Sequence, residues 1–109
     1  MQQARNIYLT GCGSAFYAAL AGTYLLNEIA GVSAHAVIAS EFGYLTKNLT
    51  QKDLVVAISQ SGETIDLLQP LRQIQAQKIP IVALINVPGS SLYRLADYPL
   101  EIMAGPKKQ

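Results

Sequence analysis

The sequence predicts an α/β fold, a three-layer sandwich built on a doubly wound parallel sheet of about five strands in the flavodoxin-like order. Short apolar runs alternate along the chain with stretches of helical periodicity. The runs are apolar at consecutive positions, as expected for strands that are covered on both faces. A chain of 109 residues, half of them apolar, is sufficient for one domain with one core.

The first half of the chain contains two predicted strands, each followed by a helix. In order, these are strand Asn6–Thr10, helix Ala15–Ala30, strand Ala34–Ala39 and helix Ser40–Leu45. Gly31 is the predicted C-cap of the long helix, because glycine adopts the left-handed backbone conformation without a steric penalty. Ser40 is the predicted N-cap of the short helix, since its hydroxyl can accept from a first-turn N–H.

The second half continues the same alternation and ends in a strand. In order, the predicted elements are strand Asp53–Ser59, turn Gln60–Glu63, helix Thr64–Gln77, strand Pro80–Asn86, helix Ser90–Ala96 and strand Tyr98–Met103. Pro80 is tolerated because a proline at the first position of a strand removes no central ladder bond. Pro70 interrupts the helical hydrogen bonding, so we expect a kink between Thr64 and Pro70.

Composition argues against several classes of function. A net charge of +1 leaves no basic surplus for a run of phosphates, so we expect no nucleic-acid partner. One cysteine and one histidine cannot supply a zinc site, and no metal is predicted. A single cysteine also forms no intrachain disulfide, which favours a reducing compartment, the cytoplasm. The longest weakly polar run, Ala15–Leu26, is too short to span a bilayer, so no membrane contact is predicted.

The segment that follows the third predicted strand has the composition of a phosphate site. Ser59-Gln60-Ser61-Gly62-Glu63-Thr64 places three hydroxyls and one flexible glycine directly before a helix. Helix N-termini offer backbone N–H groups and a positive dipole end to an anion. In parallel sheets, ligands bind beyond the carboxyl ends of the strands. Ordinary helix capping by Ser61 or Thr64 explains the same residues, and the sequence leaves both interpretations open.

The turn after the first predicted strand, Gly11-Cys12-Gly13-Ser14, is a second candidate. Dinucleotide binding would require a glycine where Phe16 stands, and no P-loop motif is present, so no cofactor is predicted. The two glycines and Ser14 suit a phosphosugar, or simply a tight strand-to-helix turn. Cys12 near a helix N-terminus resembles an activated nucleophile, but no histidine is near in sequence, and a buried packing role is favoured.

Four segments together resemble the first SIS (sugar isomerase) domain of the glucosamine-6-phosphate synthases, the glutamine-dependent fructose-6-phosphate aminotransferases. They are Gly11-Cys12-Gly13-Ser14, Ile38-Ala39-Ser40-Glu41-Phe42, Ile58–Thr64 and Asn86-Val87-Pro88-Gly89-Ser90-Ser91-Leu92. The S-Q-S-G-E-T run is the most specific of the four, since other SIS domains share only S-x-S-G. The resemblance covers nearly the whole chain.

The resemblance implies a site for a hexose 6-phosphate. Its phosphate would be held by Ser59, Gln60, Ser61 and Thr64. Further contacts to the substrate would come from Cys12, Gly13, Ser14 and Gly62. Ala15 stands where the family has a serine, so this chain lacks one family hydroxyl.

The resemblance also implies that residues 1–109 are a single SIS domain of a longer chain. The family's glutaminase domain and second SIS domain have no counterpart here, and no catalytic residue is predicted within the 109 residues. Two alternatives remain: an SIS-type sugar-phosphate sensor, and part of a related phosphosugar isomerase, deaminase or deglycase.

The first long helix predicts a protein partner. Between Ala18 and Leu26, only Thr23 and the Tyr24 hydroxyl interrupt Ala, Leu and Gly. A helix that is apolar all round needs cover on more than one side. The sheet covers one side, so we expect a homodimer or a neighbouring SIS domain on another.

Overall fold

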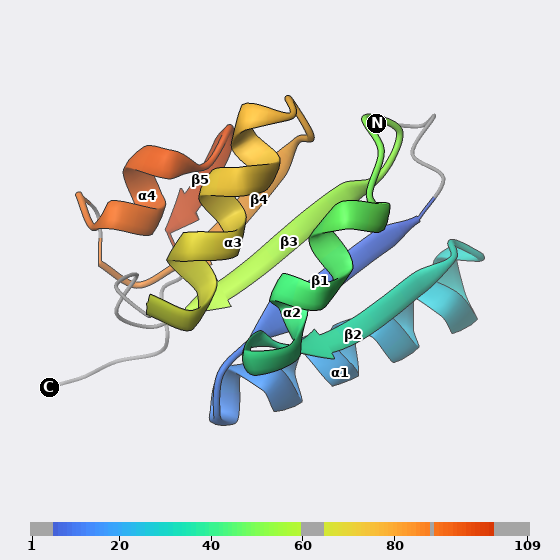
Figure 1. Ribbon diagram of the computed structural model, residues 1–109. Helices are drawn as coiled ribbons and strands as arrows, with labels where there is room; N and C mark the ends of the chain where they lie inside the picture. Colours follow the sequence, from blue (N-terminus) through green and yellow to red (C-terminus); the bar gives the residue numbers. More distant parts are fainter. Residues whose placement is uncertain (1–5, 60–64, 88, 102–109) are drawn as a thin grey trace, which may run out of the picture.

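A five-stranded parallel sheet forms the centre of the protein. The computed structural model describes residues 6–59, 65–87 and 89–101 (Figure 1). The strands are β1 Ile7–Gly11, β2 Ala34–Ile38, β3 Leu54–Ser59, β4 Ile81–Ile85 and β5 Tyr98–Glu101. All neighbouring pairs are parallel, in the order β2-β1-β3-β4-β5. The predicted flavodoxin-like sheet is therefore confirmed.

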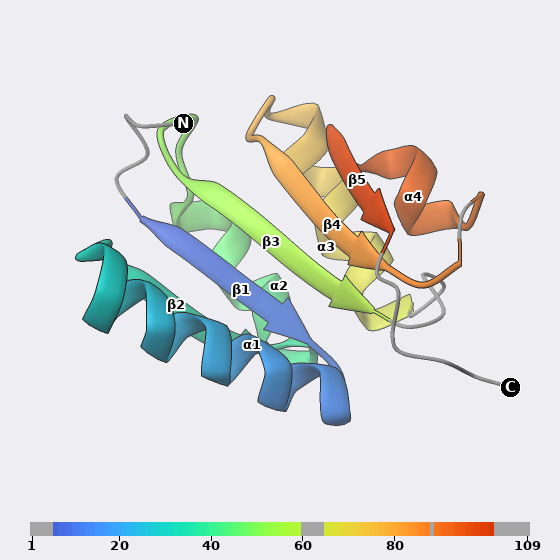
Figure 2. The same ribbon diagram turned by 180° about the vertical axis from the view of Figure 1, so that it is seen from behind.

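Helices cover the two faces of the sheet unequally. The helices are α1 Ser14–Leu25, α2 Ala39–Leu45, α3 Ile65–Ala76 and α4 Ser91–Leu95. A π-helical turn, Leu26–Ala30, extends α1, and a 3₁₀ turn, Thr46–Asn48, extends α2. Figures 1 and 2 show α1 on one face and α2, α3 and α4 on the other. This arrangement follows from right-handed crossovers, in which the direction of a connection across the sheet decides the face on which its helix lies. The connection from β1 to β2 runs toward the β2 edge, whereas the three later connections run toward the β5 edge.

The main hydrophobic core lies between the sheet and the layer of α2, α3 and α4. Its largest fully buried side chains include Phe42, Leu71, Ile74, Ile81 and Ile85. On α3, four apolar residues that recur at helical spacing in the sequence are all buried: Leu67, Leu68, Leu71 and Ile74. A smaller cluster of Leu9, Ala19 and Ala34 lies under α1.

One of the two predicted helix caps is present, and a further helix carries a cap that was not predicted. Gly31 ends the first long helical stretch in the left-handed conformation, with φ 64°. The Ser90 hydroxyl accepts a hydrogen bond from the Tyr93 N–H and caps α4. The prediction for Ser40 is wrong, because α2 begins one residue earlier, at Ala39, and Ile38 precedes it without a side-chain cap. Ala39 is itself buried in the core, so packing sets the start of this helix.

Other predicted helix boundaries differ from the structure by one residue, at the start of α1, at the end of α3 and at both ends of α4. The first helix begins at Ser14, one residue before its predicted start. Helix α3 runs continuously through the buried Pro70, and Thr64, the predicted first residue, lies outside the described residues. A kink before Pro70 stays a prediction. Within the described ranges, no helix is both long and apolar enough to cross a membrane.

Candidate functional site

The carboxyl ends of β1, β3 and β4 meet at one edge of the sheet. The register pairs Gly11 with Ile58, and Ser59 with Ile85, so the three strands end nearly level. The chain leaves β1 toward one face, into α1, and leaves β3 toward the other face, into α3. Neighbouring strands whose connections leave on opposite faces mark the ligand position in doubly wound sheets.

Ser59 is the described member of the predicted phosphate-binding segment. It is the last residue of β3, it is buried, and it shares a face with Val55 and Ala57, the face covered by α3. Gln60, Ser61, Gly62 and Thr64 lie outside the described residues. The structure describes the two residues that flank the rest of this segment, Ser59 at the end of β3 and Ile65 at the start of α3, and does not test the segment as a phosphate site.

The turn between β1 and α1 is tight, and its geometry explains why glycine stands at both Gly11 and Gly13. A Cβ on Gly11 would lie 2.9 Å from the Cβ of Ala15, so the helix approaches the strand too closely for any side chain there. Gly13 has φ 56° and ψ −128° and precedes the first residue of α1, Ser14. Gly13 and Ser14, which the resemblance implies as substrate contacts, are exposed at the carboxyl edge.

The Cys12 thiol is a packing group in this structure. Cys12 is half-buried and packs against the main core. Burial raises the pKa of the Cys12 thiol above its usual value, and the carboxylate of Asp66 raises it further. A thiol with a raised pKa is protonated near neutral pH and is a poor nucleophile. Asp66 itself lies in the first turn of α3.

Two buried polar atoms at this edge were not singled out from the sequence. Thr10 Oγ1 and Asn86 Oδ1 have no hydrogen-bond partner among the described residues. Thr10 is the penultimate residue of β1, and Asn86 directly follows β4. The signal in the sequence for these two residues was a polar side chain at the end of an apolar strand. Such a side chain is notable because burying a polar atom without a hydrogen-bond partner costs about 1–3 kcal/mol.

Among the described titratable residues outside the predicted segment, His35 lies away from this edge, whereas Glu41 and Asp66 lie in the first turns of α2 and α3, which follow strands that end at this edge. His35 is the second residue of β2, near the amino edge, where its Nε2 lies 3.2 Å from Asn6 Oδ1 and its ring stacks on Tyr8. Glu41 is exposed on α2. Asp66 is exposed on α3 beside the Cys12 turn.

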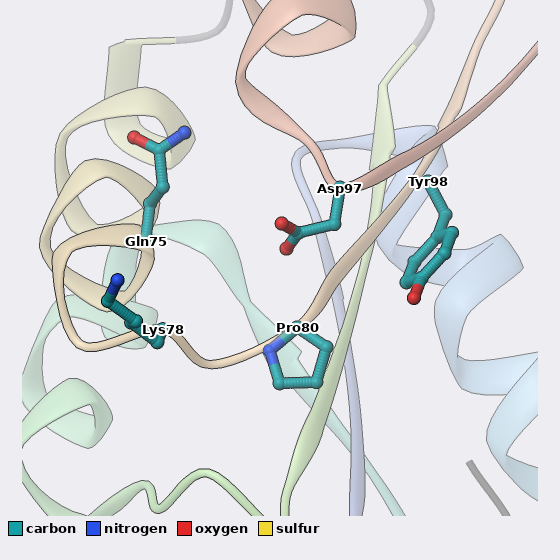
Figure 3. Close-up of a pocket in the computed structure, with 5 residues that line it drawn as sticks. All are labelled: Gln75, Lys78, Pro80, Asp97 and Tyr98. Carbon is teal, nitrogen blue, oxygen red and sulfur yellow. The ribbon is translucent and has the colours of Figure 1, made fainter.

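A hollow of about 490 Å³ opens at the amino edge of the sheet, away from the predicted site (Figure 3). Its lining residues are Gln75, Lys78, Pro80, Asp97 and Tyr98. Asp97 Oδ2 accepts from the Ile81 N–H at 2.8 Å, and Gln75 Nε2 donates to the Leu95 carbonyl at 3.0 Å. Asp97 thus joins the start of β4 to the residue before β5, and Gln75 joins α3 to the end of α4, so both side chains have a structural role.

Comparisons with known proteins match the whole chain. The SIS domain family profile matches residues 1–109. The chain is 39% identical over 105 residues to the glutamine–fructose-6-phosphate aminotransferase (isomerizing) of Helicobacter pylori and 41% identical over 105 residues to that of Bacillus subtilis. Each alignment covers 96% of this chain and 18% of the relative. The chain therefore spans about a fifth of the length of these curated relatives.

A solved structure gives the same result in three dimensions. The C-terminal domain of glucosamine-fructose-6-phosphate aminotransferase from Francisella tularensis superposes with a TM-score of 0.86 and 34% sequence identity. The match covers 97% of this chain and 30% of that one. The resemblance seen in the four sequence segments is therefore supported by an independent comparison of folds.

Proposed function

This chain belongs to the SIS domain family, and from that premise we propose that it binds a hexose 6-phosphate as one domain of a longer glutamine–fructose-6-phosphate aminotransferase. The proposal rests on the relatives at 39–41% identity, whose names state that activity. The parent protein would be cytoplasmic and would act in amino sugar synthesis. The fructose 6-phosphate or glucosamine 6-phosphate would bind at the carboxyl edge of the sheet.

One observation carries the proposal: the hydroxyl-rich segment Ser59–Thr64 joins β3 to α3 at the carboxyl edge. Ser59 ends the strand, and helix α3 begins at Ile65, directly after the segment. The phosphate would therefore sit at the positive end of a 12-residue helix. Hydroxyls of Ser59, Ser61 and Thr64, with Gln60 beside them, would supply neutral hydrogen-bond donors.

The neighbouring β1–α1 turn supplies the second half of the proposed site. Asp66, in the first turn of α3, contributes to the raised pKa of Cys12 in this turn. Cys12, Gly13 and Ser14 would then contact the sugar or its phosphate from the side of α1, and Gly62 would permit a close backbone approach from the side of α3.

Titration calorimetry with fructose 6-phosphate tests this site through Ser61. We expect Ser61→Ala to weaken binding by roughly 1–2 kcal/mol, because one donor to a charged group is lost. Ser61→Asp should abolish binding, since a fixed carboxylate repels the phosphate. The matched control is Ser33→Ala, which removes an exposed hydroxyl at the opposite edge, where Ser33 contacts Asn6.

The control should bind as the unaltered protein does. Equal affinity of Ser61→Asp and the unaltered protein would overturn the site assignment. Binding lost equally in Ser61→Ala and Ser33→Ala would point to general destabilisation and would also contradict it.

A further inference from the structure

Strand β4 is followed by a polar residue, although the strand itself is apolar throughout. Its five residues, Ile81–Ile85, are all aliphatic, and Asn86 comes directly after them. The register pairs Ile85 with Ser59, so Asn86 lies one residue beyond the last pair of β3 and β4 (Figure 2). Adjacent strands are about 4.8 Å apart. Asn86 is therefore a close neighbour of the place where the predicted phosphate-binding segment leaves β3.

The side chain of Asn86 carries an unused hydrogen-bond acceptor. Its Oδ1 is shielded from water and has no hydrogen-bond partner among the described residues. The residue as a whole is half-buried, so part of it reaches the surface of the carboxyl edge. A buried acceptor without a partner costs free energy, because it has given up its hydrogen bonds to water. Folding alone therefore does not explain why an asparagine stands here.

The usual structural role of an asparagine in a turn is closed to Asn86. Such a side chain forms an Asx turn, in which its Oδ1 accepts from the backbone N–H two residues later. Two residues after Asn86 stands Pro88, which has no N–H. The loop before α4 is held by another group, since Arg94 Nη1 donates a hydrogen bond to the Gly89 carbonyl. The Asn86 amide is thus left for another partner.

An amide oxygen suits a position next to a bound phosphate. A carboxylate there would repel the phosphate, whereas a lysine would offer only donors. An amide oxygen is uncharged and accepts a hydrogen bond. The complementary ligand group is an O–H or N–H donor that lies beside a phosphate in the same molecule. The hydroxyl groups of a hexose 6-phosphate meet this requirement.

We propose that Asn86 Oδ1 accepts a hydrogen bond from a sugar hydroxyl of the bound hexose 6-phosphate. This inference rests on the proposed function and extends its site to a third strand, β4. The last torsion of an asparagine side chain is broad, so rotation of the amide presents Oδ1 to the ligand. Asn86 then fixes the orientation of the sugar, while the segment after β3 holds the phosphate.

Titration calorimetry with two ligands, fructose 6-phosphate and inorganic phosphate, tests the role of Asn86. We expect Asn86→Ala to weaken fructose 6-phosphate binding about five- to tenfold, because one hydrogen bond is lost. The affinity for inorganic phosphate should stay equal to that of the unaltered protein, because this ligand has no sugar hydroxyl. Unchanged phosphate binding also shows that the variant is folded. Equal loss of affinity for both ligands would overturn the proposal.

The matched control is Thr10→Val, which removes the other unpaired polar atom discussed at this edge. Thr10 is fully buried in β1, and valine has nearly the same shape. We expect Thr10→Val to bind both ligands as the unaltered protein does and to raise the Tm. If Thr10→Val and Asn86→Ala lost the same affinity for fructose 6-phosphate, the effect would come from packing of the edge, and the proposal would be wrong.

A second variant, Asn86→Asp, tests the requirement for an uncharged acceptor. Aspartate keeps the shape and an acceptor oxygen, but it adds a negative charge beside the phosphate. We expect both ligands to bind about tenfold more weakly at low ionic strength. The deficit should shrink when salt is added, because salt screens the repulsion. Affinities equal to those of the unaltered protein for both ligands would contradict the position of Asn86 beside the phosphate.

Failure of this inference is distinguishable from failure of the proposed function. If Ser61→Asp abolished fructose 6-phosphate binding while Asn86→Ala left it unchanged, only the role of Asn86 would be contradicted. If Asn86→Ala selectively weakened fructose 6-phosphate binding while Ser61→Asp bound both ligands normally, only the assignment of the phosphate to the segment after β3 would be contradicted.

Discussion

At the residue scale, the turn between β1 and α1 is where backbone geometry is most constrained. Gly13 combines φ 56° with ψ −128°, a backbone conformation that residues with a side chain rarely adopt. No atom lies within 4 Å of a Cβ placed there, so steric packing does not restrict the position. The requirement for glycine is therefore conformational, and it positions the first residue of α1 at the carboxyl edge.

Gly13→Ala should lower the free energy of unfolding by about 1–3 kcal/mol, because alanine is strained at this backbone conformation. The matched control is Gly43→Ala in α2, where a Cβ also meets nothing within 4 Å but φ is not positive. That change should stabilise the protein by about 0.5–1 kcal/mol. Urea unfolding measures both, and a stabilising Gly13→Ala would contradict the role of this conformation.

The Cys12 thiol offers a second test at this scale. Its pKa is raised in the folded state, first by burial and then by Asp66. The full free energy of unfolding is kept while the thiol is protonated in both the folded and the unfolded state. Because the pKa is higher in the folded state, part of this free energy is lost as pH rises through the folded pKa. We therefore expect Cys12→Ala to reduce the loss of stability at alkaline pH, above about 9.

Alkylation of Cys12 by iodoacetamide reports the same pKa directly. Its rate should rise at a higher pH than for a free thiol, and Asp66→Asn should move the profile partly back, since burial is the larger cause. A profile that lies below that of a free thiol would contradict the packing role and would indicate an activated nucleophile.

At the scale of elements, helix α1 is covered on one side only. Ala19 is its single fully buried residue, whereas Tyr17 and Tyr24 are 71% and 66% exposed. Leu20, Leu25 and Ile29 are also exposed on the same helical stretch. The sequence predicted a partner for this helix, and the exposed side chains are those that such a partner would contact.

We expect the protein to self-associate through α1 at high concentration, and Tyr24→Lys to weaken the association. An apolar helix side that is exposed to water favours contact with a second copy or a neighbouring SIS domain. Tyr44→Lys on α2, another exposed tyrosine, is the matched control. Sedimentation equilibrium measures both variants, and a single 11.7 kDa species at all concentrations would contradict the prediction.

At the scale of the whole molecule, the sequence offers four candidate bases for isomerisation, and the structure describes the positions of three of them. Ketose–aldose isomerisation needs a base within about 3 Å of the proton that moves. His35 lies near the opposite edge of the sheet, and Glu41 is exposed on α2. Asp66 lies beside the Cys12 turn, on the helix side. Glu63, the remaining candidate, lies outside the described residues.

We therefore expect the 109-residue chain to be catalytically silent. The purified protein is incubated with fructose 6-phosphate, with and without ammonium, and glucose 6-phosphate and glucosamine 6-phosphate are followed. No product above a buffer blank is expected. Turnover that survives repurification and disappears in Glu63→Gln would contradict this prediction and would assign the base to Glu63.

The sequence by itself determined the type and order of the strands and helices. Consecutive apolar residues in Leu54–Ser59 and Ile81–Ile85 indicated doubly covered strands, and Leu67, Leu68, Leu71 and Ile74 indicated one buried helix face. Gly31 was recognised as a cap. These features depend on neighbouring residues, so a local reading of the chain is sufficient to find them.

Only the tertiary structure decided which residues come together and which faces stay bare. The sequence predicted that α2 begins at Ser40, whereas in the structure it begins at the buried Ala39, because core packing outweighs the capping preference. The pKa of Cys12 is raised by burial and by Asp66, a residue more than fifty positions away in the sequence. The exposure of Tyr98 and Leu100 follows from the strand order β2-β1-β3-β4-β5, which places a single crossover helix on their face. Contacts and burial of this kind depend on distant segments, and no local pattern in the sequence encodes them.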